Sequence, residues 1–390
     1  DINKNLDLKE IRERIDKLDR QLVELLEERL YIVQEVAQFK KNTGKKIFDE
    51  EREKEVIKKN LERVKNKELN HYIELILKDI MNSSKEYQKF KIGISTKYVN
   101  DLELENKKLG YTGVPGSYAY EVLMNLLKNN KNSNFSSIEE NKNIFHFNSH
   151  KDLVEAVHTN QIDLAILPIE NSIVGEVRDS IDLINTKNIH IIGEVRHKIS
   201  HNLLGVKGSK IKDIKNVYSH DQAFMQCSEF LSKYEWHLNR MTNTAISGKY
   251  IASKNQKENA CIANMKTKEM YDLELLKQNI NNEEENYTRF FVISNESIVI
   301  DGSDKISIVT SAKNESGALI ELLQIFYKYG LNMVNLKSRP RVNKPWEYYF
   351  YIDFEGNMAD EKVKMALEEM REKSNYLQIL GNYKLYNLKI

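Results

Sequence analysis

The chain has 390 residues, which is enough for roughly two to four domains. Lysine and arginine (59) almost balance aspartate and glutamate (58), so the net charge gives no reason to expect a nucleic acid or a membrane surface as a partner. The two cysteines, Cys227 and Cys261, exclude a disulfide framework and a cysteine-based zinc site. We find no signal core and no apolar run of about 18 residues, so we expect a cytoplasmic protein.

The first segment, residues 1–90, is expected to be all-α. From residue 6 onward it contains one glycine and no proline, and its apolar residues recur at helical spacing. The pattern predicts helices over residues 6–42, 49–65 and 69–89. The first helix is long, and we expect a second subunit to cover it.

Residues 108–295 alternate short apolar runs with helical patterns, which is typical of an α/β domain. The runs "IDLAILPI", "IHIIGEV" and "NVYSH" predict strands, whereas "VRDSIDLINT" and "DQAFMQCSEFLSKY" predict helices. Residues 128–143 are polar and without periodicity, which predicts a loop. Residues 304–390 follow the order strand, helix, two strands, helix, strand, which is the α+β ferredoxin-like plan. The sequence therefore indicates a multi-domain protein.

Two cations lie on the apolar face of the first helix. Arg29 and Lys40 fall within the same stripe as the apolar residues Ile11, Ile15, Leu18, Leu22, Leu25, Val33 and Val36. One such cation is usually explained by an aliphatic stem that packs beneath a hydrated head group. Two buried cations need an anion, so we consider an anionic ligand within the helices. Further polar residues stand where the helices could converge: Arg12, Asp49, Arg52, Glu53, Ser84 and Gln88. The stretch "DEEREKE" alone would also suit a solvated helix start.

In the spacing of these eight residues, the segment resembles the all-helical chorismate mutase family. That family rearranges chorismate to prephenate by a pericyclic step, so catalysis rests on holding the reactive conformer and stabilising charge on the ether oxygen. The resemblance implies that Arg29, and Arg12 from a second subunit, bind the two carboxylates. It also implies roles for the rest of the set: Lys40 and Gln88 donate to the ether oxygen, Glu53 and Asp49 hold the ring hydroxyl region, and Arg52 and Ser84 bind substrate.

Four motifs of the middle segment place polar residues at strand ends or helix starts. They are "YTGVPGSYAYE" with Ser117, "ILPIENSIVGEV" with Asn171, "VYSHDQAFMQC" with Ser219 and Gln226, and "NYTRFFVIS" with Thr288 and Arg289. In the first motif a Gly-Pro turn precedes a helix, and its N–H groups could face an anion. Each motif alone also has an ordinary explanation as a turn or a strand start.

In their order and spacing, the four motifs resemble the prephenate dehydratase family, whose fold is two α/β lobes around a cleft, like a periplasmic binding protein. The family converts prephenate to phenylpyruvate by loss of carbon dioxide and of the ring hydroxyl as water. The resemblance implies that Thr288 donates a hydrogen bond to the leaving hydroxyl, while Arg289 either anchors a carboxylate or forms a structural ion pair. The implied substrate contacts are Ser117, Asn171, Ser219 and Gln226. The chain departs from the family at Asn243, where many members carry Asp, and at Asp221, where Pro is usual.

The last segment resembles the ACT domain that is attached to prephenate dehydratases and binds phenylalanine between subunits. The matching signatures are "GALIELL" and "SRP", which implies effector contacts from Gly317, Ala318, Leu319, Ser338 and Arg339. Lys337 replaces the glutamate that usually precedes "SRP". We expect a chain that lacks residues 304–390 to stay active and to ignore phenylalanine.

Together these segments predict a bifunctional chorismate mutase and prephenate dehydratase of phenylalanine biosynthesis, inhibited by L-phenylalanine. The expected ligands are chorismate, prephenate and L-phenylalanine, in a homodimer or homotetramer, with no cofactor, no metal, no nucleic acid and no membrane. Two alternatives stay open: a ligand-sensing transcription regulator with a helical head, and a helical segment that only dimerises. The first lacks a helix-turn-helix pair and a basic face, and the second does not explain an arginine and a lysine at the centre of the interface.

Overall fold

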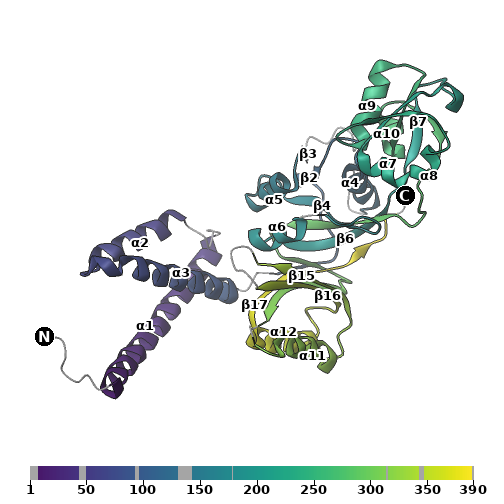
Figure 1. The fold of residues 1–390 in the computed structure, drawn as a ribbon. Helices are drawn as coiled ribbons and strands as arrows, with labels where there is room; N and C mark the ends of the chain where they lie inside the picture. The colour runs from purple at the N-terminus through teal and green to yellow at the C-terminus, as the bar shows by residue number, and fades with distance from the viewer. Residues whose placement is uncertain are drawn as a thin grey trace. The chain divides into compact units, whose positions relative to one another are not determined.

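The chain forms two compact units, Asp1–Thr96 and Lys97–Ile390, each coloured in chain order in Figure 1. The computed structural model describes residues 8–43, 50–92, 96–130, 143–177, 179–312, 315–341 and 347–388. Within these ranges, no helix combines the length and the apolar character that crossing a lipid bilayer requires.

The first unit is all-α, as the sequence predicts. Its helices are α1 (Leu8–Thr43), α2 (Glu50–Arg63) and α3 (Asn70–Ile92), with a short 3-10 turn at Lys67–Leu69 before α3. The Asn66 side chain caps that turn by accepting a hydrogen bond of 3.1 Å from the backbone N–H of Glu68. The three predicted helices are therefore confirmed to within a few residues at each end.

Among the described residues of the helical unit, only part of the apolar stripe on α1 is covered. Val33 and Ala37, in the C-terminal half, are buried where α1 packs on α3. Leu18 and Leu25, further toward the N-terminus, are 64% and 63% exposed. Leaving such an apolar row in water is unfavourable, so this half of the helix presents a surface for another molecule to cover.

The second unit begins with a lobe built on a seven-stranded mixed sheet with the strand order β18-β6-β12-β4-β2-β3, where β5 pairs with β4. The central strands β4 and β12 are almost continuously apolar because side chains on both of their faces are buried. A separate parallel pair, β1 with β13, lies outside this sheet. The bounds are β1 Lys97–Val99, β2 Leu109–Thr112, α4 Tyr118–Asn129, β3 Ile144–Phe147, α5 His150–His158, β4 Leu164–Asn171, β5 Gly175–Glu176, α6 Ser180–Lys187, β6 His190–Lys198, β12 Tyr287–Ser294 and β13 Ile298–Ile300.

A second lobe carries a five-stranded sheet with the order β11-β7-β10-β8-β9. Both cysteines are fully buried here, and burial raises the pKa of the Cys227 thiol to about 12. The α/β class and the two-lobed expectation are thus confirmed. The bounds are β7 Asn202–Gly205, a 3-10 turn Ile211–Asp213, β8 Asn216–Ser219, α7 Asp221–Gln226, α8 Ser228–Leu231, β9 His237–Arg240, α9 Thr244–Lys254, β10 Asn259–Ala263, α10 Met265–Met270 and β11 Glu274–Lys277.

One predicted helix of this lobe is broken in two. The pattern over residues 221–234 predicts a continuous helix, but the chain leaves helical geometry at Cys227 and restarts as α8. Asn282, which is distant in sequence, supplies the cause: its Oδ1 accepts a hydrogen bond of 3.0 Å from the Glu229 N–H, and its Nδ2 donates to Ser228 Oγ at 2.9 Å. This side chain caps α8 from outside, which the local sequence could not reveal.

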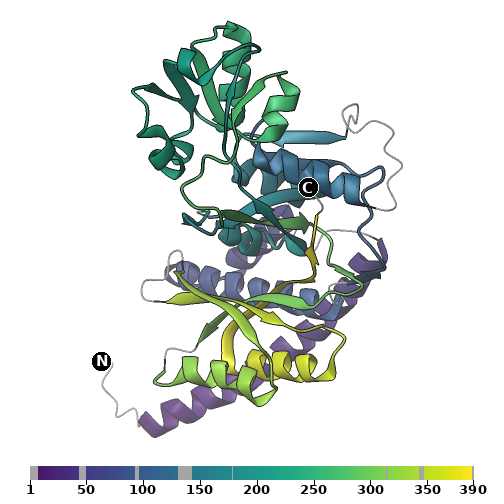
Figure 2. The ribbon, with the colours of Figure 1, turned by 90° about the vertical axis from the view of Figure 1, so that its right-hand side faces the viewer.

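The last segment has the predicted βαββαβ order and forms a four-stranded antiparallel sheet with the order β15-β16-β14-β17. Helices α11 and α12 cover one face of the sheet, and the other face is turned toward β6 of the first lobe, as Figure 1 shows. The first lobe thus lies between the second lobe and this C-terminal sheet (Figure 2). The bounds are β14 Lys305–Ala312, α11 Ala318–Lys328, β15 Met333–Pro340, β16 Tyr348–Glu355, α12 Glu361–Lys373, β17 Ser374–Tyr383 and β18 Leu385–Tyr386.

The C-terminal sheet is joined to the first lobe more tightly than the sequence suggests. Strand β18 pairs in parallel with β6 and so extends the sheet of the first lobe. Beside it, a Cβ at Gly381 would lie 2.0 Å from the carbonyl oxygen of Ile191, so only glycine allows the two backbones to approach this closely.

Candidate functional site

A cleft of about 580 Å³ opens between the two lobes of the second unit. It lies where the chain crosses from β6 to β7 and returns from β11 to β12: Ile199 and His201 of the first crossing line it, and so do Thr288 and Phe290 of β12. Its lining combines apolar side chains with many uncharged polar groups, which is typical of a small-molecule site. The lining residues are Thr112, Ser117, Tyr118, Ala119, Pro168, Asn171, Val174, Gly175, Glu176, Val177, Ile199, His201, His220, Gln222, Ala223, Gln226, Thr242, Asn243, Thr244, Thr288 and Phe290.

Asn171 and Thr288 face each other across the paired strands β4 and β12. The Oδ1 atom of Asn171 accepts hydrogen bonds from the N–H groups of Ile173 (3.1 Å) and Val174 (3.0 Å), so its Nδ2 must be the donor on the other side. This Nδ2 donates to Thr288 Oγ1 at 3.0 Å and to Asn286 Oδ1 at 2.8 Å. The Thr288 hydroxyl is therefore an acceptor from Asn171, and its own hydrogen has no acceptor among the described residues.

The donor and acceptor atoms of the groups beyond Asn286 follow in the same way. Because its Oδ1 accepts, its Nδ2 donates to Gln226 Oε1 at 2.9 Å. The Nε2 atom of His201 lies 2.8 Å from the same oxygen and must carry a hydrogen to bond with it. The Nδ1 atom then accepts from the Tyr118 hydroxyl at 3.0 Å, a hydrogen shared with the carbonyl oxygen of Ser200 at 3.1 Å. Burial lowers the pKa of His201, although its bond to Gln226 opposes this, so the ring is neutral at pH 7.

Two helix N-termini converge on the cleft. Helix α4 starts there with Ser117 as its N-cap, and α9 starts there with Asn243, whose Oδ1 accepts from the Ile246 N–H at 2.8 Å. The first N–H groups of a helix have no acceptor within the helix, and the helix dipole favours anions at this end. Asn and Asp are equivalent N-caps, so the departure at Asn243 keeps this feature intact. Among the described residues, the lining contains neither lysine nor arginine, and the cleft can therefore bind carboxylates chiefly through N–H and hydroxyl groups.

Four of the predicted dehydratase residues, Ser117, Asn171, Gln226 and Thr288, are brought together in this cleft, but Ser219 is not. Its hydroxyl is fully buried and donates to the carbonyl oxygen of Ile262 at 2.9 Å, which ties β8 to β10. The structure therefore gives no support to the predicted substrate contact of Ser219, because its side chain is buried within the second lobe.

Arg289 is directed away from the cleft, since neighbours along a strand point to opposite faces. It donates to Asp353 Oδ2 at 2.8 Å and to the fully buried Glu194 at 3.0 Å. Burial alone would lower the pKa of Arg289, but Tyr383 and these carboxylates outweigh that effect and raise it. Of the two alternatives for Arg289, the geometry favours the structural ion pair over a substrate contact.

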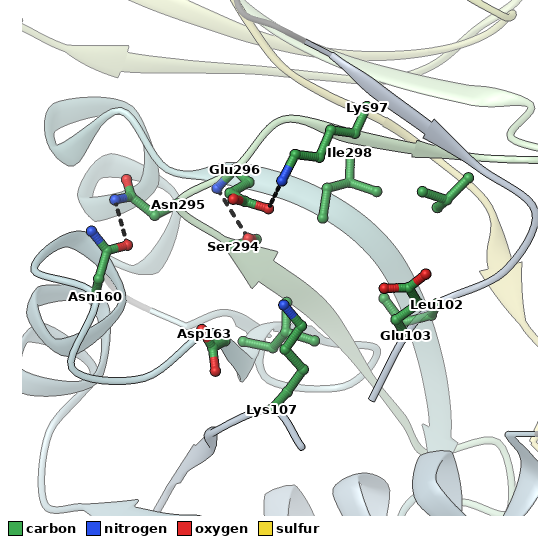
Figure 3. A pocket seen from close by; sticks show the side chains of 12 residues that line it. Lys97, Leu102, Glu103, Lys107, Asn160, Asp163, Ser294, Asn295, Glu296 and Ile298 are labelled. Atoms are coloured by element: carbon green, nitrogen blue, oxygen red, sulfur yellow. Dashed lines mark hydrogen bonds and ion pairs between the residues drawn. The ribbon is translucent and has the colours of Figure 1, made fainter. Parts of the chain in front are cut away.

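The sequence patterns gave no reason to select Tyr118, His201 or Asn286. His201 and Asn286 stand on the two crossings between lobes, in short polar stretches without periodicity. Their role follows only from the pairing that brings Asn286, His201 and Gln226 to one point. Figure 3 shows a different and smaller cavity of about 130 Å³, near the ion pair of Lys97 and Glu296 (2.8 Å), and it holds none of the predicted residues.

In the helical unit, Arg29 and Ser84 are in contact through a hydrogen bond from the guanidinium to the hydroxyl. Ser84 and Gln88 are buried one turn apart on α3, and Gln88 Oε1 has no hydrogen-bond partner among the described residues. A buried amide oxygen without a partner is costly and is explained where a ligand completes the site. Partial burial also lowers the pKa of Arg29.

Of the remaining predicted mutase residues, Arg12 does not reach that contact within one chain. Arg12 lies 17 positions before Arg29 on the same helix, a rise of about 26 Å. Arg52 is exposed and pairs with Glu55 at 2.7 Å, while Glu53 on the same helix is half-buried. Asp49 and the side chain of Lys40 lie outside the described residues.

Of the predicted effector residues, Gly317 is exposed at the start of α11 with φ of +85°, a conformation that favours glycine. Ala318 and Leu319 are half-buried in the first turn of α11. On β15, Ser338 is exposed, and Arg339 points the opposite way to pair with Glu176 (3.1 Å) within the same chain.

Comparison with known proteins gives matches to both units. Residues 11–89 match the family model "Chorismate mutase type II", and residues 109–298 match "Prephenate dehydratase". A bifunctional chorismate mutase/prephenate dehydratase of Buchnera aphidicola (subsp. Schizaphis graminum) is 32% identical over 98% of this chain and 97% of its own length. One of Aquifex aeolicus is 30% identical over 97% of this chain and 98% of its own length.

A solved prephenate dehydratase of Arthrobacter aurescens, in complex with L-Phe, has a TM-score of 0.60 and 25% identity, covering 71% of this chain and 89% of that chain. The chain belongs to the family of bifunctional chorismate mutase/prephenate dehydratases.

Proposed function

We propose that the interlobe cleft is the dehydratase site of this chain and that the helical unit carries the mutase site. The chain is an enzyme of phenylalanine biosynthesis that rearranges chorismate to prephenate and then converts prephenate to phenylpyruvate. The observation that carries the assignment of the cleft is the Thr288 hydroxyl, which accepts from Asn171 and keeps its hydrogen available to the cavity.

In the dehydratase step, the ring carboxylate of prephenate leaves as carbon dioxide and its bonding electrons enter the ring as the hydroxyl leaves. The leaving hydroxide needs one proton to become water. Thr288 donates its hydrogen bond to that oxygen and so lowers the charge that develops there. Its hydroxyl is too weak an acid to ionise alone, so the proton is finally supplied by solvent.

The two carboxylates of prephenate fit the two helix N-termini of the cleft. We assign one carboxylate to the start of α4 at Ser117 and the other to the start of α9 at Asn243. Gln226 and the network through His201 form the floor between them. Holding both ends aligns the ring hydroxyl with Thr288, which is the main contribution that positioning can make.

For the mutase we propose a site completed by a second subunit. Arg29, Ser84 and Gln88 form one wall, with Lys40, Asp49, Arg52 and Glu53 from the same chain. Arg12 is about 26 Å away along α1 and serves the site of the partner. The exposed apolar half of α1 supports this pairing, because a second copy would cover it, and we propose a homodimer or homotetramer on that ground.

We further propose that the C-terminal sheet is an ACT regulatory domain and that L-phenylalanine inhibits the dehydratase through it. The βαββαβ order and the Arthrobacter aurescens complex with L-Phe support this role. Gly317, Ala318, Leu319 and Ser338 are our candidates for the effector site. Arg339 is a weaker candidate, since its guanidinium is engaged by carboxylates of the same chain.

We propose functional boundaries at residues 1–90, 108–295 and 304–390, a cytoplasmic location, and a ligand cleft arranged as in periplasmic binding proteins. The strands β1, β13 and β18 belong structurally with the first lobe or beside it, so the boundaries describe functions and not separable bodies.

The decisive experiment supplies chorismate to the purified full-length chain and follows prephenate and phenylpyruvate with time. Prephenate should rise and then fall as phenylpyruvate accumulates.

Gln88→Leu should abolish most conversion of chorismate without lowering stability, because it replaces an unpartnered buried amide by an apolar group, and it should still convert supplied prephenate. Absence of phenylpyruvate from either substrate would reject the proposed function.

A further inference from the structure

Strand β15 of the C-terminal sheet holds the outer side of the β4–β5 hairpin by ion pairs. Lys337 Nζ lies 3.0 Å from Glu170 Oε1 and 3.0 Å from Glu176 Oε1. Arg339 contacts Glu176 at 3.1 Å and Asp182, at the start of α6, at 2.8 Å. These side chains are partly buried, with Lys337 24% and Arg339 21% exposed.

The hairpin needs these cations because its two glutamates repel each other. Glu170 of β4 is paired directly with Glu176 of β5, and both carboxylates turn to the same side. Like charges directly opposite each other on paired strands destabilise the pairing. Lys337 bridges them, and Arg339 adds a second cation. Asp179 also faces Arg339 at 3.7 Å, and the Tyr351 hydroxyl donates to Asp182 at 2.7 Å.

The same hairpin is a wall of the dehydratase cleft. Val174, Gly175 and Glu176 line the cavity, and Asn171, opposite Gly175 in the ladder, donates to Thr288. Asn171 is itself fixed by the N–H groups of the turn that joins β4 to β5. Any opening of the hairpin would therefore release Asn171 from the turn that holds it beside Thr288.

We propose that Lys337 and Arg339 are positioning residues for the dehydratase reaction. They keep the β4–β5 hairpin closed by neutralising Glu170 and Glu176 on its outer face, so that Asn171 on the opposite face stays fixed beside Thr288. The proposal rests on the assignment of the cleft to prephenate. It gives a role to Lys337, at the position where the related ACT signature usually has glutamate.

The test compares steady-state kinetics of full-length Lys337→Gln and Arg339→Gln with the wild type, using prephenate as substrate. We expect kcat/KM to fall about tenfold, mainly through a higher KM, because the wall formed by Val174 and Gly175 is no longer held in place and an uncompensated carboxylate beside the cleft weakens the binding of a dianion. Mutase activity on chorismate serves as a control within the same chain and should not change.

The matched control is Arg341→Gln. Arg341 follows β15 directly and pairs with Glu347 at 2.6 Å, which is outside the hairpin. Its dehydratase KM should stay within about twofold of wild type. The double variant Lys337→Gln with Glu170→Gln should regain most of the lost kcat/KM, since it removes the repulsion, whereas a general loss of folding would not be repaired by losing a second charge.

The proposal is overturned if Lys337→Gln and Arg339→Gln keep wild-type KM, if Arg341→Gln has the same defect, or if the double variant is no better than the single one. The proposed function is tested separately by the wild-type chain and by Thr288→Val. A wild-type chain that does not turn over prephenate rejects the cleft assignment itself.

Discussion

In the proposed site, the Thr288 hydroxyl accepts from Asn171 Nδ2 and keeps its own hydrogen for the substrate. We expect Thr288→Val to keep the shape and remove this donor, so that kcat for phenylpyruvate formation falls by about 10²-fold or more. Asn171 Nδ2 would lose one acceptor but retain Asn286 Oδ1 and the Tyr287 carbonyl, so the fold should persist. The measurement is phenylpyruvate formation from supplied prephenate.

Thr288→Ser is the matched control, because it retains the hydroxyl and should keep most of the activity. Mutase turnover should be normal in both variants. A fall of less than tenfold in Thr288→Val would show that Thr288 has only a structural role.

Asn171 gives a second test of the same geometry. Asn171→Asp can still accept from Ile173 and Val174, but its other oxygen can no longer donate. Thr288 would then donate its hydrogen to that carboxylate and not to the substrate. We therefore expect a loss of kcat comparable to that of Thr288→Val although Thr288 is intact, with a raised KM from the added negative charge. An Asn171→Asp variant with normal kcat would mean that the amide does not set the direction of the Thr288 hydroxyl.

At the scale of elements, strand β6 places a buried histidine at its first position. Burial lowers the pKa of His190 to about 4, from an ordinary value near 6.5. Above pH 6.5 the ring is neutral in both states. As the pH falls below 6.5, the unfolded chain takes up a proton that the folded chain does not, so the free energy of unfolding falls until about pH 4, by up to about 3 kcal/mol.

The measurement is urea unfolding of the wild type and of His190→Leu between pH 7 and pH 4. Burial also lowers the pKa of His150 and His201, so the wild type should lose stability through more than one histidine. The difference between the two proteins isolates His190, and the variant should lose less stability as the pH falls. Parallel curves would contradict this account.

Helices and strands were predictable where local residue periodicity determines them. The strand over residues 305–312 and the long first helix follow from periodicity alone, and the structure has both. The helix over 221–234 was not predictable as two pieces, because Asn282 caps the second piece from another part of the chain. The candidate site was only partly predictable for the same reason, because some of its residues depend on contacts between distant parts of the chain. Thr288 and Asn171 stand in recognisable motifs, whereas His201 and Asn286 gain their role only from contacts between distant crossings.

At the scale of the whole molecule, the C-terminal segment packs into the same compact unit as the two lobes. Arg289 and Lys305 surround the buried carboxylate of Glu194, where they outweigh the effect of burial and lower its pKa. Tyr351 and Tyr383 belong to the same apolar cluster as the first-lobe strands. The sequence alone suggests that the dehydratase stays active without residues 304–390. The structure instead leads us to expect that their removal destabilises it.

We predict that a chain ending at residue 303 loses dehydratase activity at a much lower urea concentration than the full chain. Each large apolar side chain newly exposed costs about 2 kcal/mol, and Arg289 and Glu194 lose partners. Mutase activity, carried by the other unit, should be unaffected. A truncated chain with wild-type dehydratase activity and the same urea midpoint would show that the segment is separable after all.

The two buried thiols make the opening of the second lobe measurable. Cys227 and Cys261 are both fully buried in the second lobe, with no cysteine elsewhere in the sequence. Since only a thiolate exposed to solvent is modified readily, the rate of alkylation reports how often this lobe opens, without a signal from the helices or the C-terminal sheet. A ligand that bridges the lobes should slow alkylation in proportion to its occupancy. The alkylation rate of the two native cysteines should therefore measure substrate binding.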